Sequence, residues 1–147
     1  MDSVFENFVI SVLKIYRIVQ KIKNYEMREF GLKSVHVMCI YYLSGSDRGL
    51  SSGDLMRLTL EDKAAVSRAV AQLREKGYVE YDGTYHSPVR LTEQGREIAQ
   101  AVLEKANRAV KAGSADFSAE EREKFHCSLV EISEKLKIYY QNLSKEV

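Results

Sequence analysis

The chain of 147 residues lacks several features that mark whole classes of protein. It has two cysteines, one proline and no tryptophan, so a hydrophobic core, and not a disulfide framework, must hold it together. Its longest apolar run, residues 35–43, is interrupted by His36 and is too short to span a bilayer. The residues near the start are periodically apolar, which is not a signal-peptide pattern. We therefore expect a cytoplasmic protein with no membrane partner.

A large excess of charge is also missing. The chain has 22 lysines and arginines against 21 aspartates and glutamates, a net charge of +1. This balance excludes a polycationic coat for nucleic acid but leaves room for one localised basic surface. Any argument for DNA binding therefore depends on where the cations lie.

Helical patterns are what the sequence has most of. Apolar residues recur at helical spacing, and pairs of capping-box type mark the helix starts. These pairs are Ser3 with Glu6, Ser51 with Asp54, Thr59 with Asp62, and Ser118 with Glu121. Gly77 is placed to end one helix, and Thr92 is placed to start the next. The signals predict helices over residues 4–24, 34–43, 51–58, 62–76, 93–112 and 119–143.

Residues 78–91 have a different character, because strand-forming residues replace the helical period. These residues are Val79, Tyr81, Tyr85 and Val89. Asp82-Gly83 is a hairpin-turn dipeptide, and Pro88 is tolerable in a two-stranded edge ribbon. The sequence thus predicts a mainly α fold with a small β-ribbon, in the order of a winged helix-turn-helix with helices on both sides.

The second helix of a helix-turn-helix enters the major groove of DNA, whose width matches one α-helix. The outward face from Lys63 to Lys76 has four cations and one anion. Small residues such as Ala64 would let this helix approach the groove closely. The residues expected to read base edges are Ser67, Arg68 and Gln72, and those expected to contact phosphates are Ser51, Lys63 and Arg74. The alternative is a solvated helix with a mild basic bias.

Several segments together resemble the multiple-antibiotic-resistance regulator (MarR) family. The resemblance covers nearly the whole chain, and its most specific part is Leu91-Thr92-Glu93-Gln94-Gly95 after the ribbon. The other segments are residues 50–55, 64–73 and 75–79. The resemblance implies a dimeric winged-helix transcription factor, often a repressor, whose DNA affinity is changed by a small molecule, a metal or thiol oxidation. It also implies a single domain over 1–147, with a DNA-binding lobe at 34–91 and dimerisation helices at 1–30 and 93–147.

The ribbon departs from the pattern of this family. Members usually carry an Asp-x-Arg type of wing whose arginine enters the minor groove, whereas residues 82–88 contain no arginine. Arg90 lies at the base of the ribbon, and His86 is the tip residue that could become cationic. We expect weaker or more salt-sensitive binding than in a typical relative, or a wing that contacts phosphates through Tyr85, His86 or Thr84.

The outer helices carry apolar stripes that a lobe of this size cannot cover. The expected dimer-interface residues are Phe5, Phe8 and Val12 in the first helix and Phe125, Leu129, Ile132, Leu136 and Tyr139 in the last. The four-three spacing of the last helix is of coiled-coil type. A two-fold homodimer would hold two recognition helices about 34 Å apart and predict a pseudo-palindromic operator. The alternative is a monomer with an internal three-helix bundle.

A ligand pocket is expected where the dimerisation helices of the family meet the DNA-binding lobe. The matching residues here are Tyr16, Tyr25, Phe30, His36, Tyr41 and Tyr42. Aromatic side chains with polar tips could line a site for a phenolic or other amphipathic small-molecule effector. Equally, the same residues could fill the junction between the lobes.

Metal, thiol and catalytic chemistry find little support. His36 and Cys39 share one helix face, but a zinc site needs three or four converging ligands, so we expect no metal site and no cofactor. Cys39 and Cys127 are expected to pack and not to sense oxidants. Three histidines and no phosphate-binding loop give no catalytic constellation.

Two functions remain from the sequence. The first is a dimeric, sequence-specific regulator of transcription that binds double-stranded DNA. The second is a protein-interaction module that keeps the winged-helix scaffold, suggested by the arginine-free wing and the near-neutral charge. Affinity for random duplex that falls steeply with salt would favour the first.

Overall fold

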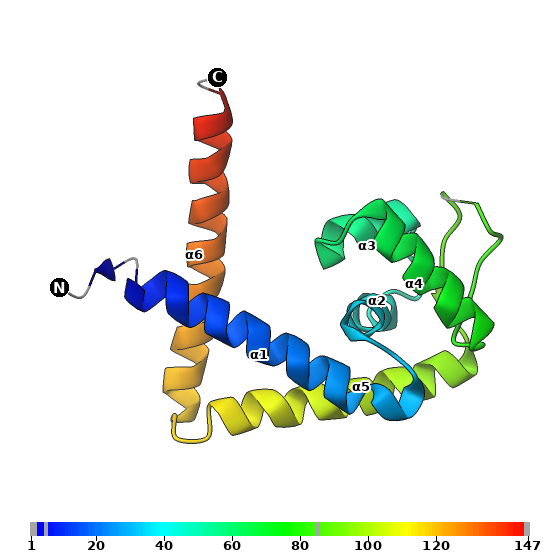
Figure 1. The fold of residues 1–147 in the computed structure, drawn as a ribbon, viewed down its shortest axis with the longest axis horizontal. Coiled ribbons are helices and arrows are strands. Elements are labelled where there is room, and N and C mark those ends of the chain that lie inside the picture. The colour runs from blue at the N-terminus through cyan, green and yellow to red at the C-terminus, as the bar shows by residue number, and fades with distance from the viewer. Residues whose placement is uncertain (1–2, 5, 85, 146–147) are drawn as a thin grey trace. The chain divides into compact units, whose positions relative to one another are not determined.

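A computed structural model describes residues 3–4, 6–84 and 86–145 of the chain (Figure 1). A π-helical turn, Glu6–Ile10, leads into the first helix, and a 3-10 turn, Arg28–Phe30, follows it. The other elements are α1 Ser11–Glu26, α2 Ser34–Ser44, α3 Ser52–Thr59, α4 Lys63–Glu75, β1 Val79–Glu80, β2 Arg90–Leu91, α5 Glu93–Gly113 and α6 Ala119–Lys145. The predicted fold class, mainly α with a small β-ribbon, is confirmed. None of the helices in the described ranges is both long and apolar enough to cross a membrane.

The chain divides into two compact units, residues 1–109 and 110–147. The first contains α1 to α4, the ribbon and most of α5, and the second contains the end of α5 and α6. Within the first unit, α3 and α4 lie beside each other and both contact α2, and the ribbon follows α4 (Figure 1). This unit therefore holds all the elements of the predicted winged helix.

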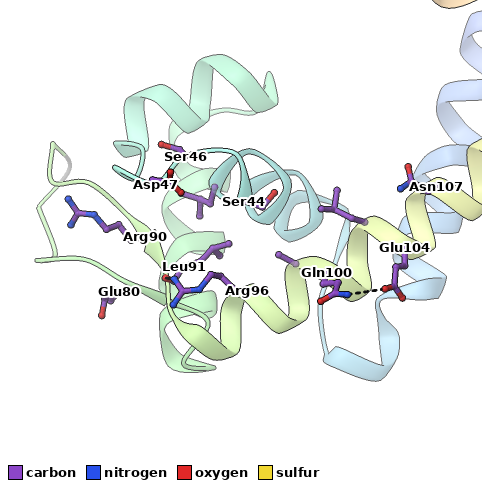
Figure 2. Close-up of a pocket in the computed structure, with 13 residues that line it drawn as sticks. Ser44, Ser46, Asp47, Glu80, Arg90, Leu91, Arg96, Gln100, Glu104 and Asn107 are labelled. Carbon is purple, nitrogen blue, oxygen red and sulfur yellow. Dashed lines mark hydrogen bonds between the residues drawn. The ribbon is translucent and has the colours of Figure 1, made fainter. Parts of the chain in front are cut away.

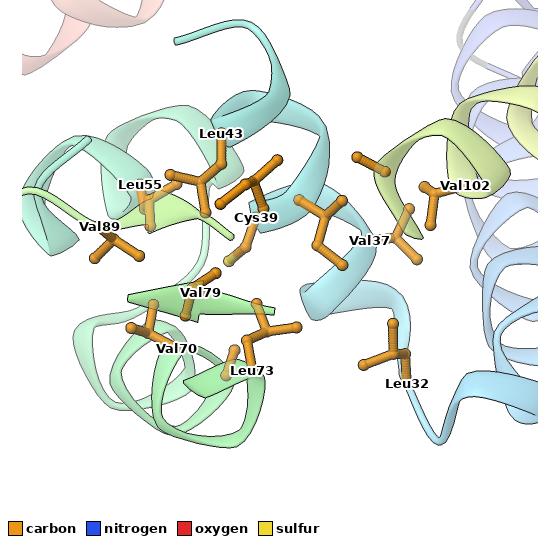
Figure 3. Packing of buried hydrophobic residues seen from close by; sticks show 14 of the residues in the cluster. Leu32, Val37, Cys39, Leu43, Leu55, Val70, Leu73, Val79, Val89 and Val102 are labelled. Carbon is orange, nitrogen blue, oxygen red and sulfur yellow. The ribbon is translucent and has the colours of Figure 1, made fainter. Parts of the chain in front are cut away.

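The core of the first unit is built around α2, whose sequence is apolar on most sides. Ile40 and Cys39 are fully buried. They pack with Leu55 of α3, Leu73 of α4 and residues of the ribbon and α5 (Figure 3). Each fully buried aliphatic side chain contributes about 1.5–3 kcal/mol of transfer free energy. This cluster fixes the backbone of α4 while leaving its opposite face in solvent.

The cap of α3 confirms one predicted capping box. The backbone N–H of Asp54 donates to Ser51 Oγ at 3.1 Å, and the N–H of Ser51 donates to the Asp54 carboxylate at 3.1 Å. The predicted pairing of Thr59 with Asp62 is wrong. Asp62 itself caps α4 by accepting from the N–H of Ala65 at 2.7 Å, while the Thr59 hydroxyl donates to the Leu55 carbonyl.

The turn between α3 and α4 explains that difference. Leu60 has a φ of 60° and lies in the left-handed region, which ends α3 and turns the chain before α4 begins. The residue directly before α4 is therefore Asp62, and Thr59 is still within α3. At its other end, α4 stops as predicted at Gly77, which has a φ of 76°, and the N–H of Tyr78 bonds to the Leu73 carbonyl.

The β-ribbon is shorter than the predicted span of 78–91. Its paired residues are Val79 with Leu91 and Glu80 with Arg90. The next residue whose backbone would face β1 is Pro88, which has no N–H to donate, while Val89 exchanges backbone hydrogen bonds with Leu50 on the other side. Asp82-Gly83 consequently lies in a wide loop over residues 81–89 and does not close a two-residue turn.

The Leu-Thr-x-x-Gly segment locks the ribbon to the start of α5. The hydroxyl of Thr92 accepts from the N–H of Gly95 at 3.0 Å and donates to the Gly77 carbonyl at 2.6 Å. A Cβ on Gly95 would lie 1.9 Å from the Tyr78 carbonyl oxygen, far inside any possible contact. The segment is therefore needed for close packing between α5 and the chain that follows α4.

Candidate nucleic-acid interface

Helix α4 has the two faces that its sequence predicts. Val66, Ala69, Val70 and Leu73 are buried. Lys63, Ala64, Ser67, Arg68 and Ala71 are exposed. No acidic residue lies between Lys63 and Arg74. The exposed face thus combines small side chains with cations, which suits close approach to a polyanion.

Ser51 lies at the amino end of α3, but its hydroxyl is engaged. It donates to the Asp54 carboxylate at 2.7 Å, and the hydrogen bonds from Ser51 hold the pKa of Asp54 below its ordinary value. Arg57 pairs with the same carboxylate. A phosphate contact by Ser51 would therefore have to use a hydroxyl that already serves the helix cap.

Gln72 is also engaged within the chain. It lies on the flank of α4 that faces α2, and its Oε1 is 2.7 Å from Nε2 of His36. His36 is 3% exposed, whereas Gln72 is exposed. The pair joins the core to the rim of the predicted base-reading face, and no local sequence pattern signals a contact across 36 positions.

Arg74 is held against the ribbon. Its guanidinium carbon lies 4.8 Å from the centre of the Tyr81 ring, and its Nη1 is 3.7 Å from the position that a Cβ on Gly83 would take. Residues 81–89 contain Asp82 and no lysine or arginine. Arg74 therefore brings a positive charge next to a loop that has no lysine or arginine. The sequence analysis does not predict the contact between Arg74 and Tyr81.

The remaining predicted wing residues are spread over the ribbon. Thr84 and His86 are exposed, and Tyr85 lies outside the described residues. Arg90 is exposed in β2 at the base of the ribbon, as the sequence predicts. It also borders a cavity, where Figure 2 shows it at the ribbon side.

That cavity has a volume of about 570 Å³ and is lined by the end of α2, the following loop, the ribbon and α5. Its charged and polar residues include Asp47, Glu80, Arg90, Arg96 and Glu104 (Figure 2). Arg96 donates to the Leu91 carbonyl at 3.1 Å. The six residues predicted for an effector pocket are not among the residues described as lining this cavity.

Those six residues lie in different surroundings. His36 is buried, Phe30 and Tyr42 pack against the core, and Tyr41 meets Tyr42 edge to face at 5.1 Å between ring centres. Tyr16 and Tyr25 are exposed. Tyr25 borders a shallower cavity of about 320 Å³, where Lys105 forms ion pairs with Glu26 and Glu29. The predicted pocket remains a prediction.

The cysteines differ in accessibility. Cys39 is fully buried, and burial raises the pKa of its thiol to about 12, so it is a neutral packing group. Cys127 is exposed on α6, so the expectation that it packs is wrong for the single chain. Among the residues that the structure describes, no three histidine, cysteine or acidic side chains are grouped to hold a metal ion.

The outer helices present exposed apolar side chains. No residue of α1 or α6 is buried, and every residue of both helices is among those described. Seven of the eight predicted interface residues are exposed: Phe8, Val12, Phe125, Leu129, Ile132, Leu136 and Tyr139. The eighth, Phe5, lies outside the described residues. Unpaired apolar surface of this extent is typical of an association site.

The order of helix, turn, helix and β-ribbon, with an exposed second helix, defines a winged helix-turn-helix protein. Residues 30–84 match the model of the MarR family. The uncharacterized HTH-type transcriptional regulator YdgJ of Bacillus subtilis (strain 168) is 38% identical over 77 residues, which are 50% of this chain and 47% of that protein. The match thus spans about half the length of this relative. The resemblance to the MarR family is confirmed, and the family model covers residues 30–84.

Solved structures extend the likeness of the fold to nearly the whole chain. A MarR protein from Peptoclostridium difficile has a TM-score of 0.82 and 19% identity, covering 97% of this chain and 95% of its own. The MepR–DNA complex of S. aureus has a TM-score of 0.76 and 16% identity, covering 91% of this chain and 99% of its own. The fold is therefore that of MarR-family regulators.

Proposed function

We propose that the chain is a homodimeric, sequence-specific DNA-binding regulator of transcription, and specifically a repressor. The observation that carries the proposal is the outward face of α4. It exposes Lys63, Ser67 and Arg68 among small residues, while the buried face of the same helix is fixed to the core. A likeness in fold to a structure solved with DNA adds support.

The roles proposed for single residues follow from their places on α4. Ser67 and Arg68 read base edges, because they lie on the exposed face where Ala64 and Ala71 allow close approach. Lys63, in the first turn of α4, and Arg74, in its last turn, contact phosphates. Arg74, stacked on Tyr81, brings positive charge to the wing, and the exposed Thr84 and His86 add further contacts.

The dimer is proposed from the exposed apolar faces of α1 and α6. Leu129, Leu136 and Tyr139 are between 40% and 63% exposed in the single chain. Burying apolar area at about 25 cal/mol per Å² would drive two copies together. The two recognition helices would then meet successive major grooves of a pseudo-palindromic operator.

A salt titration tests the proposal. Fluorescence anisotropy would follow binding of the full chain to a labelled random duplex between about 50 and 200 mM salt. A protein making 6–10 phosphate contacts should lose roughly 10³–10⁵-fold in affinity over this range. No measurable affinity for duplex DNA at low salt would instead favour the protein-interaction module, for which the anionic wing loop is the supporting observation.

Control by a small effector is part of the same proposal. The cavity of about 570 Å³ joins α5 to the ribbon, so a bound molecule would contact both elements. Its lining combines Arg90 and Arg96 with acidic residues, which suits a ligand that carries both positive and negative groups. A loss of operator affinity on adding such a compound would support the effector role.

A further inference from the structure

We infer that His36 is a positioning residue for DNA recognition: it holds the amide of Gln72 so that only the N–H donors of this side chain face the DNA. The inference rests on the proposed function, because it takes α4 as the recognition helix. It concerns a residue of α2 that is buried and that would not touch DNA itself.

The hydrogen bonds of His36 fix its proton. The backbone N–H of Lys33 points at Nδ1 of the ring at 2.8 Å, and a backbone N–H can only donate. Nδ1 must therefore accept, and the single proton of a neutral imidazole lies on Nε2. Nε2 then donates to Oε1 of Gln72 at 2.7 Å.

The surroundings keep the ring neutral. Burial lowers the pKa of His36, and the nearby cations Lys33 and Lys76 lower it further, while the bond to Gln72 opposes them. Protonation would also place a second N–H against the Lys33 N–H. The tautomer is thus the same throughout the neutral pH range.

The fixed ring determines which way the Gln72 amide faces. A flipped amide would place its NH₂ group against the donating Nε2–H of His36, so the oxygen must face the ring. Gln72 is exposed and lies one helical turn beyond Arg68, on a neighbouring position of the helix surface. Its NH₂ group is the part left to meet DNA.

This arrangement limits what Gln72 can recognise. The usual bidentate pairing of glutamine with adenine needs the amide oxygen and the NH₂ group to face the base together, and here the oxygen is turned toward His36. A lone NH₂ donor fits acceptors: O6 or N7 of guanine, N7 of adenine or O4 of thymine. Gln72 should therefore favour a major-groove acceptor and should not select adenine through its amino group.

A matched pair of variants separates this role from a structural one. His36→Asn places an acceptor near the former Nδ1, which can keep the bond to Lys33, but has no donor at the Nε2 position. His36→Gln places an amide nitrogen near that position and can restore the bond to Gln72. Gln72→Ala removes the side chain that is proposed to contact the base. The double variant His36→Asn, Gln72→Ala completes a double-mutant cycle.

The readout is the sequence preference of the full chain, obtained by selection from randomised duplexes. We expect Gln72→Ala and His36→Asn to relax the preference at the same base position, with an affinity loss of roughly 5- to 10-fold for the selected duplex. His36→Gln should retain the preference, and the double variant should match Gln72→Ala alone. Nitrogen NMR of the wild-type ring should show the proton on Nε2.

Each contrary result has its own meaning. If Gln72→Ala changes the preference and His36→Asn does not, Gln72 reads bases without being positioned, and the inference is wrong. If neither changes it while Arg68→Ala does, Gln72 is no reader and the inference is also wrong, although the proposed function stands. If the wild-type chain binds no duplex at low salt, the proposed function fails and takes the inference with it.

Discussion

Helices α2 and α6 make opposite use of similar residue types. In α2, five of 11 residues are buried, including Ile40 and Leu43. In α6, none of 27 residues is buried, although leucine, isoleucine and tyrosine recur along it. Helix α2 is apolar on most sides and is enclosed by its own lobe, whereas α6 is apolar along a stripe. An apolar stripe identifies a buried face, but it does not say whether the same chain covers that face.

The largest expected effect comes from the contact that joins α5 to the lobe. Gly95→Ala places a methyl group 1.9 Å from the Tyr78 carbonyl oxygen, so α5 must shift away, and we expect a loss of more than about 4 kcal/mol in the free energy of unfolding. Gly113→Ala in the same helix is the control, because a Cβ there meets no atom within 4 Å. Urea denaturation of both variants measures the difference, and equal midpoints would contradict the close packing.

A second pair of variants sharpens the comparison of α2 with α6. One variant removes a leucine from the buried core around α2, and the other removes a leucine from the exposed stripe of α6. Leu73→Ala, in α4 against α2, should cost about 2–5 kcal/mol of stability, because the side chain is fully buried. Leu136→Ala, on exposed α6, should leave the lobe intact and weaken dimerisation.

Urea denaturation and sedimentation equilibrium report these two effects separately. If Leu136→Ala left the monomer–dimer equilibrium unchanged while other α6 variants shifted it, the interface would lie elsewhere on the helix. An entirely monomeric wild-type chain at micromolar concentration would contradict the dimer.

A third comparison is made within α4. Arg68→Ala should cost about 1–3 kcal/mol of binding free energy and relax the sequence preference, because it removes a proposed base contact. Lys63→Ala should weaken binding to all sequences alike and reduce the salt slope by about 1. Anisotropy titrations with selected and random duplexes measure both. Intact specificity in Arg68→Ala would show that the recognition face has been assigned to the wrong residues.

The smallest expected effect is the pH dependence that His36 adds to stability. Burial lowers the pKa of this histidine in the folded chain, so the unfolded chain takes up the proton first as the pH falls through about 6.5. The free energy of unfolding should therefore decrease below that pH until the folded pKa is reached. His36→Asn should show a shallower decrease between pH 7 and 5 in urea denaturation, and identical profiles would contradict the buried neutral ring.

The sequence predicts the structural features that depend on residues close together in the chain. The buried face of α4, the Ser51 and Ser118 capping boxes and the end of α4 at Gly77 all follow from local spacing, and the structure contains them. The sequence predicts Thr59 as the capping residue of α4, whereas the structure has Asp62 in that role. The left-handed conformation of Leu60 separates Thr59 from α4, and no local rule favours leucine there.

The finer parts of the candidate interface could not be predicted, because they depend on contacts between distant segments. His36 and Gln72 meet only after α2 and α4 pack together. The backbone of Val89 also bonds to Leu50, which lies 39 positions earlier in the chain, and no local pattern marks that pairing. Arg74 was predicted to contact phosphates, but its place against Tyr81 depends on how the ribbon folds back along α4.

Footprinting of a selected duplex with the full chain tests most directly whether two α4 helices read DNA together. The account predicts two protected major-groove segments on one face of the duplex, with centres about 10–10.5 base pairs apart. It also predicts that Arg68→Ala weakens protection in both segments equally. A single protected segment, or two segments on opposite faces of the duplex, would contradict it.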